Sequence, residues 1–192
     1  MRLRRACLLC LCLFVGGAAA AERVAVCHDY GCQRQSWIDY DDAQLGRVLR
    51  MLSSTVDAAE ERKMLAEVIG RLYRWAGEQS DIRNDRGGNY ADDGIPGRMD
   101  CIDHATSTTR LLELLARHGG LRRHRVLAPV SRAWLGLVEN HWAAQIEERR
   151  PPAGEDGPEA PRFVVDSWFV DNGEPAVILP LEEWKKGAGP DV

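Results

Sequence analysis

The sequence lacks any apolar run long enough to cross a bilayer. Its longest apolar stretch covers residues 6–15, well short of the ~20 residues that a membrane-spanning helix needs. Three arginines precede this stretch and small residues follow it at 16–21, which is the pattern of a secretory signal peptide. We therefore expect residues 1–21 to be a leader and the protein to be periplasmic or secreted, with no stable membrane span after cleavage. An uncleaved anchor is the alternative.

Basic residues are not in excess. The chain has 25 Lys and Arg against 29 Asp and Glu, a formal net charge of -4, and removal of the three leader arginines changes this to -7. Proteins that bind nucleic acid usually carry a basic patch or a reading motif, and neither is present. The sequence thus excludes nucleic acid as an expected partner. Residues 22–192 have no internal repeats and suit one compact domain.

Cysteine is scarce after the predicted leader, where only Cys27, Cys32 and Cys101 remain. An exported protein meets conditions in which disulfides form. The segment CHDYGC places Cys27 and Cys32 at the ends of a short loop with Gly31 available for a tight turn, so we expect these two to pair. Cys101 is then left over, either as a buried structural residue or as a nucleophile.

Apolar periodicity predicts helices in the first half of the chain and strands in the second. Leu65, Val68 and Leu72 recur at helical spacing, and Asp57 with Glu60 resembles a capping arrangement at the helix start. Helices followed by antiparallel strands indicate a single α+β domain over 22–192. The expected helices cover 41–52, 57–76 and 101–118, and the expected strands cover 124–130, 133–138, 141–147, 162–168 and 177–179.

A long segment without apolar periodicity, residues 81–97, runs directly into Cys101. Loops of this length are uncommon in compact domains unless they are functional. It is either a wall of an active site, with Asp85, Asp92 or Asp93 available to a cation, or a solvated cluster of turns. It lacks the spacing of a calcium-binding loop, which favours the second role for these acids.

Cys101, His141 and Asp166 together suit nucleophilic catalysis. A thiol attacks as thiolate, and a helix N-terminus such as the one predicted at Cys101 favours negative charge. An imidazole can take the proton and return it to the leaving group, while a carboxylate on its other nitrogen fixes the tautomer. A hairpin between the strands of His141 and Asp166 would bring both side chains to one sheet edge beside the Cys101 helix.

The segment around these residues resembles a known group of enzymes. The stretches GRMDCIDHATSTTRLLELLARHG, NHWAAQIEE and RFVVDSWF resemble the transglutaminase-like superfamily, and within it the bacterial transglutaminase-like cysteine proteinases of the periplasm. The resemblance runs from Gly97 to about Trp184. It implies a papain- or transglutaminase-like fold, in which N-terminal helices precede a nucleophile helix packed on an antiparallel sheet, and a Cys-His-Asp triad.

The resemblance also raises the question of calcium. In members of the group that bind it, acids flanking the cysteine are ligands, and Asp100 and Asp103 match such positions. Ile102 stands where a further acid is expected. We therefore expect no required cofactor, with calcium at Asp100 and Asp103 as the alternative.

Oxyanion stabilisation is expected from the backbone N–H of Cys101 and one further donor. Asn89, Tyr90 and Trp142 are the candidates for contact with substrate or oxyanion. Asp171 lies in a turn-like segment and is the rival of Asp166. The remaining histidines are rivals of His141 for the role of base: His28, His104, His118 and His124.

The expected function is that of an exported peptidase or amidase that acts on a peptide or protein of the cell envelope. A protein-crosslinking transglutaminase is a second possibility with the same chemistry. A third is a catalytically silent module of the envelope, in which the thiol of Cys101 would be inert.

Overall fold

The chain has an α+β architecture with a two-stranded and a four-stranded antiparallel sheet. The computed structural model describes residues 21–134, 138–149 and 159–191, and the predicted leader lies almost wholly outside this part. In chain order the elements are β1 (Glu22–His28), β2 (Arg34–Tyr40), α1 (Asp42–Ser53), α2 (Ala58–Gln79), the 3-10 helix η1 (Asp81–Asn84), α3 (Cys101–Arg117), β3 (His124–Trp134), β4 (Val138–Glu148), β5 (Arg162–Asp166), β6 (Val177–Pro180) and α4 (Leu181–Lys185). No helix among the described residues is both long and apolar enough to span a bilayer.

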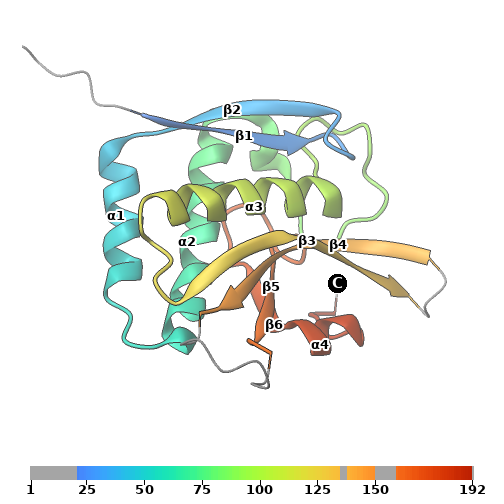
Figure 1. The fold of residues 1–192 in the computed structure, drawn as a ribbon. Helices are drawn as coiled ribbons and strands as arrows, with labels where there is room; N and C mark the ends of the chain where they lie inside the picture. Colours follow the sequence, from blue (N-terminus) through green and yellow to red (C-terminus); the bar gives the residue numbers. More distant parts are fainter. Residues whose placement is uncertain (1–20, 135–137, 150–158, 192) are drawn as a thin grey trace, which may run out of the picture.

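Helix α3 lies between the two sheets (Figure 1). The β1–β2 ribbon covers it on one side and the sheet of order β3-β4-β5-β6 lies on the other, with α1 and α2 flanking it. The main core joins apolar side chains from both sheets and these three helices, among them Val26, Leu72, Leu111 and Val165, all buried. The predicted packing of the Cys101 helix on an antiparallel sheet is confirmed. The β1–β2 ribbon on the other side of this helix was not predicted.

The central strands β4 and β5 of the four-stranded sheet bury side chains on both faces. Alternate residues of a strand point to opposite faces. Ala144 of β4 and Val165 of β5 belong to the main core, whereas Ala143 and Val164 belong to a second cluster around Trp184 of α4. His141 has the parity of Ala143, and Asp166 has the parity of Val164, so both face the second cluster.

Each of the three longer helices begins after an aspartate. The side chains of Asp41, Asp57 and Asp100 accept backbone N–H bonds from the third residue of α1, α2 and α3, respectively. Such caps satisfy N–H groups that have no partner within the helix. The predicted start of α2 at Asp57 is confirmed by its bond from the N–H of Glu60, 2.8 Å long.

Two features of the strand prediction were wrong. The described chain begins with strands and not with helices, because the pairing of β1 with β2 joins segments on either side of the cysteine loop. The expected strands 124–130 and 133–138 are not separate where they are described, since β3 runs unbroken from His124 to Trp134 and Val138 begins β4; residues 135–137 lie outside the described residues. Register shifts in β3 between Leu127 and Val130 take up the intervening Pro129 as an irregularity.

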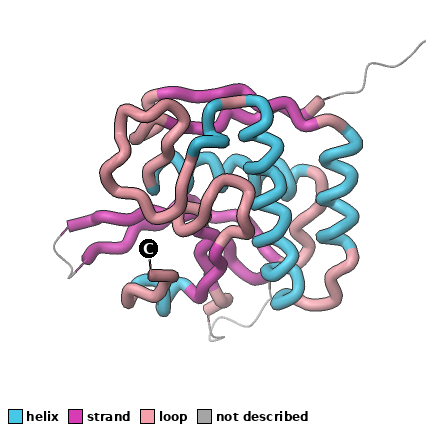
Figure 2. Tube along the Cα trace, turned by 180° about the vertical axis from the view of Figure 1, so that it is seen from behind, coloured by secondary structure: helices cyan, strands magenta, loops and turns pink. Residues whose placement is uncertain are grey.

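The loop from residue 85 to residue 100 lies at the same end of the molecule as the β1–β2 turn (Figure 2). The backbone N–H of Asp29 donates to the carbonyl oxygen of Arg98 over 2.7 Å. The hydroxyl of Tyr30 donates to Asp92, whose other carboxylate oxygen lies 2.8 Å from Nε of Arg98 in an ion pair. The loop has little secondary structure, but these contacts connect it to the β1–β2 ribbon just before α3 begins.

Candidate active site

Cys101 is the first residue of α3, directly after the N-cap Asp100. It takes no part in the disulfide, which joins Cys27 to Cys32 as expected. The Cys101 side chain is partly buried and packs against the second apolar cluster, whose members include Trp168 and Trp184. The sulfur thus lies where the N-terminal end of α3 meets the face of the four-stranded sheet that α4 covers.

His141 and Asp166 form a buried hydrogen-bonded pair. Their Nε2 and Oδ2 atoms are 2.7 Å apart, and their side chains are 7% and 1% exposed. The antiparallel pairing of β4 with β5 brings them together as the hairpin argument predicted. Asp166 also accepts the indole N–H of Trp184 at 2.9 Å and the backbone N–H of Trp168 at 3.3 Å. With Nε2 bonded to Asp166, Nδ1 is the nitrogen of His141 that remains for the thiol.

Aromatic rings enclose the imidazole of His141. The ring centroids of Trp168, Phe169 and Trp184 lie 4.8, 5.5 and 5.6 Å from its own. Arg132, the cross-strand partner of His141, places its guanidinium 4.8 Å from the Trp184 ring and donates to the carbonyl oxygens of Trp184 and Ala188. This packing fixes the plane of the imidazole, which a base in catalysis requires.

The surroundings of Cys101 act on its pKa in both directions. Burial raises the pKa of the thiol, a backbone hydrogen bond from Trp142 lowers it, and the Asp100 and Asp166 carboxylates raise it, so that the pKa is raised overall. The helix N-terminus alone therefore does not make a thiolate here. At neutral pH the resting group is the thiol, and a base has to remove its proton during attack.

The three predicted residues lie around the same apolar cluster, because Cys101 packs against it and the His141 ring contacts its members Trp168 and Trp184. The Cys101 thiol is close enough to the Trp142 backbone to bond to it, and close enough to Asp166 for its charge to raise the pKa. Trp142 follows His141 in the chain, and Asp166 holds the His141 ring. Cys101, His141 and Asp166 thus lie around one apolar cluster, in the chain order expected of a nucleophile, a base and an orienting acid.

Comparison with protein-family models, with characterised proteins and with solved structures gave no match to this chain. The geometry of the site is therefore the guide to its chemistry.

The three candidates for contact with substrate or oxyanion differ in their placement. Asn89 is directed elsewhere, because its amide donates to Asp92 over 2.5 Å. Tyr90 is 76% exposed and packs edge-on against Trp168, with ring centroids 4.8 Å apart. It therefore lines the approach to His141. Trp142 contributes its backbone at the sulfur, which is the better position for an oxyanion donor.

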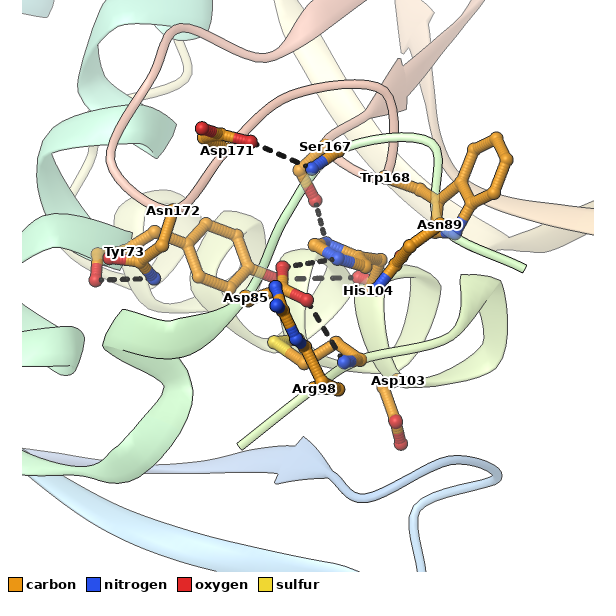
Figure 3. A network of polar contacts seen from close by, with 12 residues as sticks. Tyr73, Asp85, Asn89, Arg98, Asp103, His104, Ser167, Trp168, Asp171 and Asn172 are labelled. Atoms are coloured by element: carbon orange, nitrogen blue, oxygen red, sulfur yellow. Dashed lines mark hydrogen bonds and ion pairs between the residues drawn. The ribbon is translucent and has the colours of Figure 1, made fainter. Parts of the chain in front are cut away.

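His104 belongs to a second imidazole–carboxylate network, which Figure 3 shows from close by. Its Nε2 lies 2.9 Å from Oδ2 of Asp85, at ion-pair distance but out of line for a hydrogen bond. Its Nδ1 lies 2.8 Å from the hydroxyl of Ser167, which in turn contacts the Thr108 hydroxyl. Burial lowers the pKa of His104, but the Asp85 carboxylate together with the charges of Asp166 and Asp103 raises it, so that the pKa is raised overall.

This second set of Asp85, His104 and Ser167 resembles a serine triad in composition only. All three residues are buried, and the adjoining cavity has a volume of about 10 Å³, which is room for no more than one water. No substrate carbonyl can approach Ser167. The network is structural, which sets His104 apart from its rival His141.

The other rivals are also accounted for by contacts away from the site. Asp171 accepts from Arg86 and from the backbone N–H of Gly87. Each remaining histidine faces a carboxylate elsewhere in the fold: His28 faces Asp29, His118 faces Glu22, and His124 faces Glu61.

The residues flanking Cys101 do not fit a calcium site. All four carboxylate oxygens of Asp100 and Asp103 accept backbone N–H bonds, three of them from Tyr30, Gly31 and Cys32. N–H donors therefore occupy the positions that a cation needs. Burial and the Asp100 carboxylate raise the pKa of Asp103 to about 6, although these backbone bonds act in the opposite direction.

The sulfurs of Cys27 and Cys32 approach one carboxylate oxygen of Asp103 closely enough to share a metal ion. They are joined to each other in the disulfide, and the ligand form of cysteine is the thiolate. This group therefore offers no thiolate ligand in the oxidised protein.

Sequence reasoning assigned no role to Arg132 or Ser167, and it took Trp184 only as core or as a wall of the cleft. Their importance depends on cross-strand register and on α4 folding over the sheet, which local patterns do not reveal. Only the RFVVDSWF stretch hinted at Ser167, by placing it between Asp166 and Trp168.

Proposed function

We propose that this protein is an exported cysteine-dependent acyl-transfer enzyme with a papain- or transglutaminase-like fold, a periplasmic or secreted peptidase or amidase that acts on an envelope peptide or protein. The observation that carries the proposal is the 2.7 Å bond between His141 and Asp166 within the apolar cluster on which Cys101 packs. The resemblance around Cys101 and the Cys27–Cys32 disulfide support it further.

The chemistry follows from the protonation states of the site. As the sulfur of Cys101 bonds to the substrate carbonyl carbon, Nδ1 of His141 takes the thiol proton. Asp166 stabilises the imidazolium, and we expect the backbone N–H groups of Cys101 and Trp142 to donate to the oxyanion. The C–N bond then breaks, the imidazolium protonates the departing amine, and an acyl-enzyme remains.

Water completes the reaction in a hydrolase. His141 takes a proton from water as it attacks the acyl carbon, and the C–S bond breaks to restore the thiol. A primary amine that replaces water gives the transglutaminase outcome instead. The two outcomes share every residue named here and differ only in what reaches the acyl-enzyme.

A catalytically silent module is the second candidate, and the raised pKa of Cys101 favours it. The two candidates are separated by the rate at which iodoacetamide alkylates Cys101, followed by mass spectrometry of the Cys101 peptide. We expect His141→Ala to slow alkylation and His118→Ala, a control at a histidine of another surface, to leave it unchanged. Equal rates in all three proteins contradict the enzyme.

Substrate and outcome can be found in a second experiment. Envelope proteins are incubated with the protein or with its Cys101→Ala variant, and new peptide termini are identified by mass spectrometry. A labelled primary amine is added in parallel. New termini made only by the wild type indicate a hydrolase, whereas amine incorporation at side-chain amides indicates a transglutaminase.

A further inference from the structure

The loop closed by the disulfide has an unusual backbone. Four consecutive residues, Asp29, Tyr30, Gly31 and Cys32, have φ angles of 64°, 65°, 63° and 57°. Only glycine adopts this left-handed conformation freely, and a run of several residues in it is strongly disfavoured. The loop persists because other interactions hold it, and the bond from Cys27 to Cys32 closes it.

The left-handed turn directs its N–H groups toward the start of α3. The N–H groups of Tyr30 and Cys32 donate to the two carboxylate oxygens of Asp103 over 2.8 and 2.5 Å. The N–H of Gly31 donates to Asp100 over 2.9 Å. Successive N–H groups that converge in this way form a concave site for an anion, and here the anions are two side chains of the same protein.

Both carboxylates also hold the first turn of α3. Asp100 accepts the N–H of Asp103 over 2.9 Å, and Asp103 accepts the N–H of Asp100 over 3.2 Å. Cys101 lies between these two residues. Each carboxylate is therefore shared between the helix start and the loop, and the two negative charges, one of them fully buried, depend on the same N–H groups for compensation.

We propose that the Cys27–Cys32 disulfide sets the position of the nucleophile, because it holds residues 29–32 in the turn whose N–H groups clamp the first turn of α3. The reactivity of Cys101 then depends on the oxidation state of this loop. The catalytic consequence rests on the function proposed above, whereas the clamping of the helix does not.

Reduction reverses the arrangement. An external dithiol supplies two electrons and two protons, the S–S bond breaks, two thiols form, and the dithiol itself becomes a disulfide. Residues 29–32 are then able to leave the left-handed region, which removes the donors from Asp100 and Asp103. The two carboxylates repel each other and the turn that carries Cys101 loosens. The Cys101 thiol is accordingly less reactive until the disulfide forms.

The test compares the oxidised full-length protein with a variant that carries both Cys27→Ala and Cys32→Ala. Amide hydrogen exchange by NMR reports on Asp103 and His104, whose N–H groups bond within the first turn. We expect their protection to fall about tenfold or more, while Leu114 further along α3 changes little. We expect alkylation of Cys101 by iodoacetamide to slow by about fivefold, the factor that corresponds to a lost helix cap.

Two further variants make the result specific. Asp103→Asn keeps the disulfide but removes the carboxylate that accepts from Tyr30 and Cys32, so it should act in the same direction. It also keeps the proposal testable if the double variant does not fold. Asp41→Ala removes the other complete capping box, that of α1, and should leave exchange in α3 and alkylation of Cys101 unchanged.

The outcomes are separable. Unchanged protection of Asp103 and His104 in the double variant overturns the clamp. Reduced protection with unchanged alkylation overturns the redox dependence of the nucleophile. If wild-type alkylation does not depend on His141, the proposed function fails instead, and the exchange data alone decide whether the disulfide holds the helix start.

Discussion

Replacing Asp166 by asparagine separates two opposite effects of this residue on Cys101. Its negative charge raises the pKa of the thiol, so loss of the charge alone would favour the thiolate and speed alkylation. Its bond to Nε2 of His141 holds the base in the tautomer that leaves Nδ1 for the thiol. Loss of that bond slows every reaction that needs the base. The sign of the change in rate shows which effect is larger.

The geometry indicates that the second effect is larger. Oδ2 of Asp166 accepts from both His141 and Trp184, and Oδ1 accepts from the N–H of Trp168. If the amide oxygen of the asparagine takes the position of Oδ2, its amide nitrogen faces the N–H of Trp168. Two hydrogen-bond donors then face each other. In the reverse orientation the amide nitrogen faces the Trp184 N–H. It can then bond His141 only by donating to an Nε2 that carries no proton. The proton then moves to Nδ1, and Cys101 has no base.

The expected magnitudes follow from these contacts. A hydrogen bond to a charged group is worth about 1.5–3 kcal/mol, and an unsatisfied buried donor costs about 1–3 kcal/mol. We therefore expect Asp166→Asn to slow alkylation of Cys101 by about tenfold or more near pH 7.5. We also expect it to lower the free energy of unfolding by about 1–3 kcal/mol, which corresponds to a fall of several degrees in melting temperature.

The assay is the iodoacetamide rate at Cys101, measured beside urea unfolding. The matched control is Asp171→Asn, because Asp171 also accepts from an N–H group but is not bonded to His141. Faster or unchanged alkylation in Asp166→Asn would show that Asp166 acts only as a nearby charge. It would contradict the proposal that Asp166 orients His141.

Three further predictions address the surroundings of the triad. Because the pKa of Cys101 is raised, its alkylation rate should rise with a midpoint above that of the urea-unfolded chain, and a midpoint below pH 7 would contradict this. The raised pKa of His104 gives stability that is complete below about pH 6.5 and is lost as pH rises through the folded value. Melting temperatures from pH 6 to 9 should therefore fall less steeply in Asp85→Asn, and equal slopes would refute the pairing. A chelator should leave melting temperature and Cys101 alkylation unchanged, since N–H groups fill the positions around Asp100 and Asp103; a fall of several degrees restored by calcium would overturn this.

Much of the candidate site could be predicted because its signals are local or follow from hairpin topology. Asp57 and Asp100 stand where helix caps belong, and both cap their helices. His141 and Asp166 lie on strands adjacent in the chain, and antiparallel pairing of adjacent strands brings such residues together. The short spacing of Cys27 and Cys32 was likewise enough to predict their bond.

The rest depends on contacts between segments far apart in the chain. Nothing near Asp85 in the sequence indicates that it pairs with His104, since the contact requires the loop before α3 to fold back onto that helix. The left-handed turn at Tyr30 was hidden for a related reason. A non-glycine residue adopts positive φ only when tertiary contacts stabilise it, and those contacts come from Asp100 and Asp103.

Two separate networks of polar contacts hold the first turn of α3, which begins with Cys101, from two sides. On one side, the disulfide loop binds Asp100 and Asp103. On the other, Asp85 accepts the N–H of Met99 over 2.9 Å and pairs with His104.

Through His104, the Asp85 side also reaches Ser167, the residue after Asp166. The buried carboxylate of Asp85 therefore connects Met99 and His104, on either side of Cys101, to Ser167. Ser167 directly follows β5, the strand that ends at Asp166. Catalytic groups need to be placed to within about 0.5 Å, and a helix end beside a long loop is an imprecise support when left alone. In the proposed mechanism the thiol is protonated at rest and relies on His141 during attack, so an error in its position is not compensated by a preformed thiolate. Under this proposal, that dependence is the physical reason for the two clamps.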